Sequence, residues 1–139
     1  TMYPSCFPKD FETAILPTID DIRSIEVYRV IKSGTIHRND FLSTYEEVIL
    51  NLIPKPKNYD ERDPGTYSTS CYMDSKEIEY FLKLIMKHHP PAVIAQGKTE
   101  VKCGPSQITK ERNPAKKDTH VDWWIFEAAT PELYFRKVI

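Results

Sequence analysis

Glycine is scarce in this chain, and neither a long apolar run nor an excess of one charge is present. The 139 residues include 4 glycines, and 19 basic residues face 20 acidic ones. The apolar runs, such as 92–95, are broken within a few residues, whereas a bilayer span needs roughly 20. We therefore expect no membrane partner. The balanced charge argues against a dedicated nucleic-acid binder, which usually carries a basic excess.

Cysteine is also sparse. Cys6, Cys71 and Cys103 are an odd number at wide spacings, a pattern typical of reduced thiols in a cytosolic protein rather than of a disulfide framework. Residues 1–9 lack a basic region followed by an apolar stretch, so they do not predict a signal peptide, and Met2 is interpreted as the natural start. We expect a cytoplasmic protein whose residues 1–139 form a single globular domain.

Proline marks most of the element boundaries in the first half. Residues 25–32 are β-branched and aromatic, which predicts a strand. Ser43 precedes Glu46 by three residues, the spacing of a capping box that begins a helix. Four apolar residues then share one helical face up to Pro54, namely Val48, Ile49, Leu52 and Ile53.

The second half begins with the most regular unit. Residues 66–73 predict a strand, and Asp74 with Glu77 predicts a second capping box. Ile78, Phe81, Leu82 and Ile85 form an apolar stripe at helical spacing. We expect Phe81 to be buried, so that its replacement by alanine costs about 3–5 kcal/mol.

The remaining elements alternate irregularly. The pattern predicts a strand over 92–101 with a bulge or bend at Gly97, a loop over 104–119, a strand over 121–127 and a short helix from Thr130. This order favours an α+β domain with a mostly antiparallel sheet and two or three amphipathic helices over a doubly wound fold.

Acid–base residues are scattered along the chain. His120 and Asp122 lie two apart on a predicted strand, so they share a face and could orient a general base. They could equally be an ordinary surface pair. No histidine or cysteine stands in a metal-ligand spacing, and we expect no metal site.

Two further groups could contact a ligand or a partner. Trp123 and Trp124 point to opposite sides of their strand, so we expect one to lie in the core and the other to be covered by the chain or to contact a partner. The predicted 104–119 loop carries four basic residues that could attract a phosphate, although a solvated loop needs no ligand: Lys110, Arg112, Lys116 and Lys117.

The segment Gly65-Thr-Tyr-Ser-Thr-Ser70 before the helix from Asp74 resembles the Gly-x-Tyr-x-Thr strand and helix of the ADP-ribosyltransferase superfamily. Upstream, Val27-Tyr28-Arg29-Val30 resembles the first strand of that superfamily and the Tyr-Arg-Val of the RES-domain toxins, which act on NAD. Two features depart from the family pattern. No Glu-x-Glu pair follows, and the usual glycine does not follow Arg29.

The resemblance implies a set of roles. Arg29 would bind NAD, and Tyr67 or the segment Ser68-Thr69-Ser70 would line the nicotinamide pocket. Glu127 or Glu100 would stabilise the developing oxocarbenium ion. An arginine fork suits a pyrophosphate, and a carboxylate suits a developing cation.

Three functional hypotheses follow. The first is a binding or interaction domain without turnover, whose ligand is a protein or a phosphorylated small molecule, because no compact catalytic constellation is visible. The second is an NAD-consuming ADP-ribosyltransferase or glycohydrolase, with NAD as its cofactor or substrate. The third is a subunit of a larger complex that makes contact through the tryptophan strand or the 104–119 loop.

Overall fold

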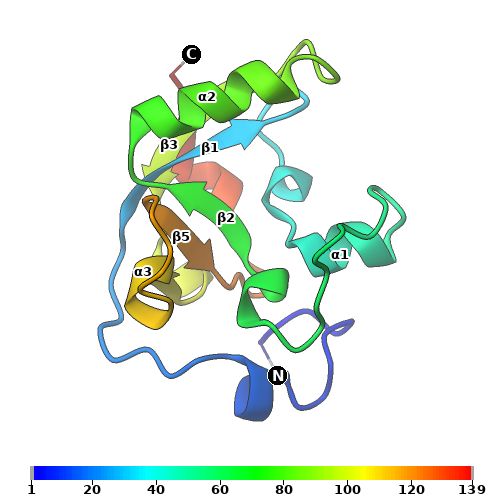
Figure 1. The fold of residues 1–139 in the computed structure, drawn as a ribbon, viewed down its shortest axis with the longest axis vertical. Coiled ribbons are helices and arrows are strands. Elements are labelled where there is room, and N and C mark those ends of the chain that lie inside the picture. The colour runs from blue at the N-terminus through cyan, green and yellow to red at the C-terminus, as the bar shows by residue number, and fades with distance from the viewer. Residues whose placement is uncertain (1, 139) are drawn as a thin grey trace.

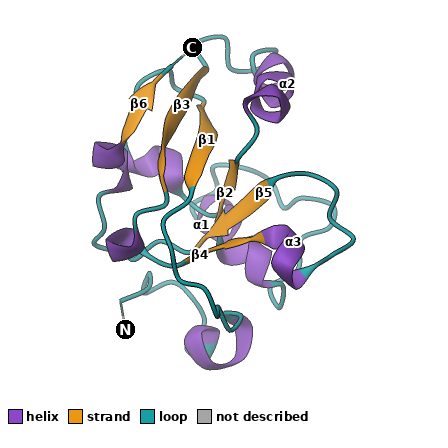
Figure 2. Ribbon diagram, turned by 90° about the vertical axis from the view of Figure 1, so that its left-hand side faces the viewer, coloured by secondary structure: helices purple, strands orange, loops and turns teal. Residues whose placement is uncertain are grey.

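The computed structural model describes residues 2–138 and contains a six-stranded antiparallel sheet (Figure 2). The strand order is β4-β5-β2-β1-β3-β6. The strands are β1 (Glu26–Ile31), β2 (Thr69–Tyr72), β3 (Val93–Lys98), β4 (Ser106–Ile108), β5 (His120–Trp123) and β6 (Phe135–Lys137). Together with the helices, this sheet confirms the expected α+β fold.

The α-helices are α1 (Thr44–Ile49), α2 (Ser75–Ile85) and α3 (Thr109–Arg112). Five shorter turns complete the pattern: a π-turn at Phe11–Ile15 and 3₁₀ turns at Arg38–Phe41, Pro64–Tyr67, Val101–Cys103 and Pro131–Tyr134. The longest helix, α2, lies over one end of the sheet beside β1 and β3, while α1 stands apart from it (Figure 1). Within residues 2–138, no helix has the length and apolarity that crossing a membrane requires.

The predicted α2 helix is confirmed, but its start differs in detail. Asp74 caps it by accepting a hydrogen bond from the Lys76 amide. Glu77 does not complete a capping box, because its carboxylate binds Thr119 instead. Ile78 and Leu82 are buried against the sheet, whereas Phe81 is only half-buried. The expectation that Phe81 is a fully buried core residue was therefore wrong.

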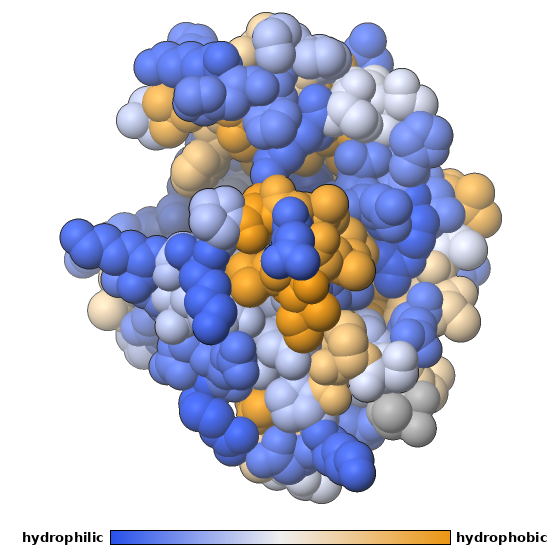
Figure 3. Space-filling view, turned by 90° about the vertical axis from the view of Figure 1, so that its right-hand side faces the viewer, coloured by the Kyte–Doolittle hydropathy of each residue, from blue (hydrophilic) through white to orange (hydrophobic). Residues whose placement is uncertain are grey.

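The α1 helix begins as predicted and ends early. The Ser43 hydroxyl accepts from the Glu46 amide, and the Glu46 carboxylate accepts from the Ser43 amide, which confirms the capping box. The helix ends at Ile49, and Asn51 takes a positive φ of 58°. The apolar residues after this turn no longer follow one helical face. Figure 3 shows an apolar surface on the side of α1, where Ile49, Leu50 and Leu52 are exposed.

The structure corrects two predictions in the C-terminal half. The expected 104–119 loop contains β4 and α3, and the expected helix after Thr130 is a single 3₁₀ turn followed by β6. Gly97 makes no bulge, since it pairs in register with Val27 and Phe135. A Cβ atom at Gly97 would lie 2.6 Å from the Phe135 ring, so the ring occupies the space that a side chain would fill.

Three apolar clusters hold these elements together. The largest lies on the face of the sheet opposite α2 and includes Val27, Ile31, Cys71, Val121 and Trp123. A smaller one lies between α2 and the sheet. The third cluster is aromatic and joins the N-terminal segment to α1 and to the turn that precedes β2. Its members are Tyr3, Phe7, Phe11, Tyr45, Tyr67 and Trp124.

Both tryptophans are fully buried, so the second is covered by the chain itself, which is one of the two expected outcomes. Trp123 donates from its indole nitrogen to the Gly104 carbonyl at 2.9 Å, and Trp124 donates to the Pro64 carbonyl at 2.9 Å. The strand alternation places them in different clusters, as expected. A partner contact through either tryptophan would require the protein to open.

Candidate functional site

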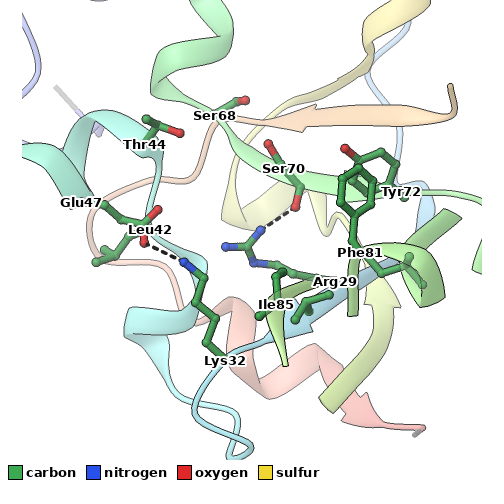
Figure 4. A pocket seen from close by; sticks show the side chains of 12 residues that line it. Arg29, Lys32, Leu42, Thr44, Glu47, Ser68, Ser70, Tyr72, Phe81 and Ile85 are labelled. Atoms are coloured by element: carbon green, nitrogen blue, oxygen red, sulfur yellow. Dashed lines mark hydrogen bonds and ion pairs between the residues drawn. The ribbon is translucent and has the colours of Figure 1, made fainter. Parts of the chain in front are cut away.

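A cavity of about 200 Å³ lies between α1, α2 and the strands β1 and β2 (Figure 4). It forms because β1 and β2 pair only at Tyr28 and Tyr72. Beyond that pair the strands separate, and α1 and α2 do not close the space between them. The cavity is therefore a consequence of the short pairing in the middle of the sheet.

Arg29 fills part of the gap between the two strands. Its Nη1 donates to the Ser70 carbonyl at 2.5 Å, and its Nε donates to the Asp40 carbonyl at 2.8 Å. The guanidinium carbon lies 5.9 Å from the centre of the Phe41 ring. Its Nη2 makes no hydrogen bond to any residue that the structure describes, so two N–H groups remain available on the cavity side (Figure 4). Arg29 therefore has two roles. Its side chain links β1 to β2 where the two strands do not pair through their backbones, and its guanidinium group gives the cavity a positive charge.

A second cation and a single carboxylate complete the charged part of the lining. The Nζ of Lys32 lies 4.0 Å from a carboxylate oxygen of Glu47, and both side chains are partly exposed. Such a long, solvated pair contributes little to stability. With Arg29, these groups give the cavity lining a formal charge of +1 (two cations and one anion).

The remaining lining divides into hydroxyl groups and an apolar wall. The hydroxyls belong to Thr44, Ser68, Ser70 and Tyr72. The apolar wall comes largely from α2, where Phe81 lies 4.9 Å from the Tyr72 ring at a tilt of 32°. Burial raises the pKa of Tyr72 to about 12, so this hydroxyl stays protonated at neutral pH.

The structure brings together three of the residues that the resemblance selects. Arg29, Ser68 and Ser70 line the same cavity. Thr69 points to the opposite face of the sheet, where its hydroxyl donates to the Phe41 carbonyl. Tyr67 is buried in the aromatic cluster, and its hydroxyl donates to the Glu61 carbonyl. These positions follow from the alternation of side chains along an extended segment.

Neither predicted acid lines this cavity. Glu127 accepts hydrogen bonds from the amide and hydroxyl of Ser5 at 3.1 Å, next to the N-terminal segment. Glu100 lines a separate groove beside β3 and β6. Glu47 is the carboxylate that the structure places in the cavity, and the sequence patterns did not select it.

A buried polar cluster adjoins the cavity through Ser68. The Ser68 hydroxyl donates to Asp122 at 2.6 Å, and Asp122 is 1% exposed. Asp122 also accepts from Thr109 at 2.8 Å and from Arg112 at 2.8 Å. Three donors thus satisfy the carboxylate, and the ion pair with Arg112 offsets its burial.

His120 lies at the end of this cluster. Its Nδ1 is 2.5 Å from the Thr109 hydroxyl and 3.8 Å from Asp122, so the expected His120–Asp122 pair is joined through Thr109 rather than directly. Burial lowers the pKa of His120, and the nearby Asp122 carboxylate opposes this effect. The ring packs edge-on against Tyr72, with 5.2 Å between centres.

The four basic residues of the 104–119 segment do not form one surface. Arg112 binds Gln107 and Asp122 and lies over the Trp124 ring, so its charge serves the fold. Lys116 pairs with Asp118 at 3.7 Å. Lys110 and Lys117 are exposed. Among the described residues, no group of three histidine, cysteine, aspartate or glutamate side chains is arranged to hold a metal ion.

Thr109 and Glu47 are the residues that tertiary contacts add to the site, and no local pattern in the sequence marks them. Arg112 was already selected from the sequence as one of four basic residues, but it pairs with Asp122. Compared with protein-family models, with curated proteins and with solved structures, the chain matches none.

Proposed function

We propose that this protein binds a small phosphorylated molecule in the cavity between α1 and α2. The observation that carries the proposal is the joint presence of Arg29 and Lys32 beside the hydroxyl groups of Thr44, Ser70 and Tyr72 in one cavity. A phosphate needs cations and donors, and Arg29 retains a nitrogen without a partner in the described part of the chain. The nearby Phe81 and Tyr72 rings would contact the uncharged part of the ligand.

The cavity volume restricts the size of the ligand. Cavities for drug-sized molecules measure about 300–1,000 Å³, whereas this one measures about 200 Å³. A phosphate joined to one ring fits this range better than a dinucleotide. A larger molecule would leave part of its surface outside the cavity.

Calorimetric titration with inorganic phosphate, ribose 5-phosphate and nicotinamide mononucleotide tests the proposal. Lys32→Met removes a partly exposed cation at the end of β1 without touching the core. Because a hydrogen bond to a charged group contributes about 1.5–3 kcal/mol, we expect Lys32→Met to weaken binding at least tenfold. Lys137→Met, on β6, is the matched control and should bind as the wild type does. Absence of binding for all three compounds, or equal binding by both variants, contradicts the proposal.

An NAD-consuming activity is the second candidate, favoured by the shared position of Arg29, Ser68 and Ser70. In that case Glu47 would be the carboxylate nearest to the reacting bond. Incubation with NAD should release nicotinamide, and both Arg29→Ala and Glu47→Gln should abolish the release, whereas Glu127→Gln should not. If wild type releases no nicotinamide and NAD does not raise the melting temperature, this candidate is rejected while small-ligand binding can still hold.

A further inference from the structure

The hydrogen bonds around Thr109 define where the protons lie. The Thr109 hydroxyl carries one hydrogen, and it lies 2.8 Å from Asp122 and 2.5 Å from Nδ1 of His120. Asp122 pairs with Arg112 and is a carboxylate that can only accept. Thr109 therefore donates its hydrogen to Asp122, and its oxygen accepts a hydrogen bond from the Nδ1–H of His120. This order selects the neutral His120 tautomer in which Nδ1 is protonated and Nε2 carries the lone pair.

The second ring nitrogen, Nε2, is not fully enclosed. Among the described residues, the buried side-chain polar atoms without a hydrogen bond are Arg38 Nη1, Tyr59 Oη and Glu132 Oε1. Nε2 of His120 is not one of them, and it accepts no hydrogen bond from a described residue. The His120 side chain is 12% exposed. Thr109 thus holds the Nδ1 side of the ring, while Nε2 is not fully enclosed by the described residues.

Burial lowers the pKa of His120, and the surrounding charges act on it in both directions. Desolvation lowers the His120 pKa first, and Lys116 and Arg112 lower it further. Asp122 and Asp118 act in the opposite direction, and the uncharged Tyr72 ring covers one edge. Arg112 pairs with Asp122 at 2.8 Å, and the same carboxylate accepts the Thr109 hydrogen, which fixes the direction of the chain of hydrogen bonds.

We propose that His120 is a general-base site that takes a proton through Nε2 from water or from the hydroxyl group of a small molecule, and that Thr109 positions it. The arrangement corresponds to a base whose second nitrogen is fixed by an orienting group, here a hydroxyl held by a buried carboxylate. This goes beyond ligand binding in the cavity, because His120 does not line it. The test uses no cavity ligand, so its outcome is independent of the binding proposal.

Long-range ¹H–¹⁵N spectra of the imidazoles test the tautomer. We expect His120 to show protonated Nδ1, in the wild type and in Thr109→Ser, which keeps the hydroxyl. In Thr109→Val the population should shift by about fivefold towards protonated Nε2, the ratio that one ordinary hydrogen bond supports. The backbone amide spectrum of each variant confirms that it is folded. Protonated Nε2 in the wild type, or no shift in Thr109→Val, overturns the proposal.

Reaction with diethyl pyrocarbonate tests whether Nε2 is a usable base. Nε2 attacks a carbonyl carbon, ethyl carbonate leaves and decomposes to ethanol and carbon dioxide, and the Nδ1 proton passes to solvent. Mass spectrometry then follows the adduct on His120, with His88 as the internal reference. We expect the midpoint of the pH–rate profile for His120 to lie below the ordinary value of 6.5. Thr109→Val should lower the His120 rate about fivefold and leave His88 unchanged.

Two results of the labelling would overturn the assignment. A His120 that does not react at pH 8 would show that Nε2 is inaccessible. Equal rates in wild type and Thr109→Val would show that the hydroxyl does not position the ring. Equal rates in wild type and Thr109→Ser, together with a loss in Thr109→Val, would support it.

Discussion

Single atoms decide several features of this protein. The lone hydroxyl hydrogen of Thr109 sets the tautomer of His120, and the missing side chain of Gly97 makes room for an aromatic ring. Arg29 replaces backbone bonds that β1 and β2 do not make with each other. In each of these cases, the role of the residue depends on the atoms that surround it in the folded protein and not on its residue type alone.

Gly97→Ala should destabilise the fold. The new Cβ would lie 2.6 Å from the Phe135 ring and 2.4 Å from the Tyr134 carbonyl oxygen. Overpacking of this kind costs about 1–3 kcal/mol, measurable as a lower urea midpoint. Gly65→Ala is the matched control, because its Cβ would meet nothing closer than 3.4 Å. Equal midpoints for both variants would contradict the role assigned to the Phe135 ring.

Elements differ in how much of their sequence pattern survives in the structure. Helix α2 keeps its apolar stripe, but the stripe serves two purposes. Ile78, Leu82 and Ile85 pack on the sheet, and Ile78, Phe81 and Ile85 line the cavity. Helix α1 keeps its capping box and loses its last turn, which leaves Leu50 and Leu52 exposed.

The two positions on α2 should respond differently to truncation. Leu82 is 9% exposed, so Leu82→Ala should cost about 2–5 kcal/mol by loss of burial and creation of a cavity. Phe81→Ala should cost less than Leu82→Ala, because Phe81 already borders open space. Urea denaturation of both variants measures the difference. The reverse order would show that Phe81 is the main anchor of the helix.

The capping box of α1 should contribute a measurable part of the stability. Ser43→Ala removes the acceptor for the Glu46 amide at 3.2 Å, and loss of an N-cap costs about 1 kcal/mol. Ser75→Ala is the control, since Ser75 lies inside the first turn of α2 and its hydroxyl makes no hydrogen bond within residues 2–138. A thermal melt that separates the two variants confirms the cap, and identical melts contradict it.

The molecule as a whole is assembled around aromatic residues as much as around the sheet. The aromatic cluster joins residues from the N-terminal segment, α1 and the turn before β2. Several of its aromatic rings contact one another, including Tyr45 and Tyr67 at 4.6 Å between centres. The N-terminal segment is thereby part of the folded body (Figure 1).

Stability should fall at alkaline pH. Burial raises the pKa of Tyr3, Tyr59 and Tyr72 from 10.0 to about 12. The folded state therefore holds protons that the unfolded state releases above pH 10, so the free energy of unfolding decreases as pH rises from 10 to about 12. The contribution is fully present below pH 10. Circular dichroism and tyrosinate absorbance, followed together, measure this. Complete tyrosine ionisation near pH 10 with an unchanged fold would contradict it.

Much of the fold could be predicted from local patterns. Short-range periodicity and capping predicted four features that match the structure. These are the strand over 25–32, the helix over 74–85, the capping box at Ser43 and the antiparallel α+β class. Predictions failed where long-range contacts compete. Glu77 binds Thr119, and Phe135 joins β3 as part of a strand.

The sequence by itself determined the class of fold, the start of α1 and α2, and the sharing of one strand face by His120 and Asp122, because these depend on residues at most a few positions apart. Only the tertiary structure decided which side chains meet. Arg29 reached Ser70 across a gap between strands, Glu47 entered the cavity, and Thr109 came between His120 and Asp122. Such contacts join residues distant in sequence, so their geometry depends on how the chain closes rather than on any local pattern.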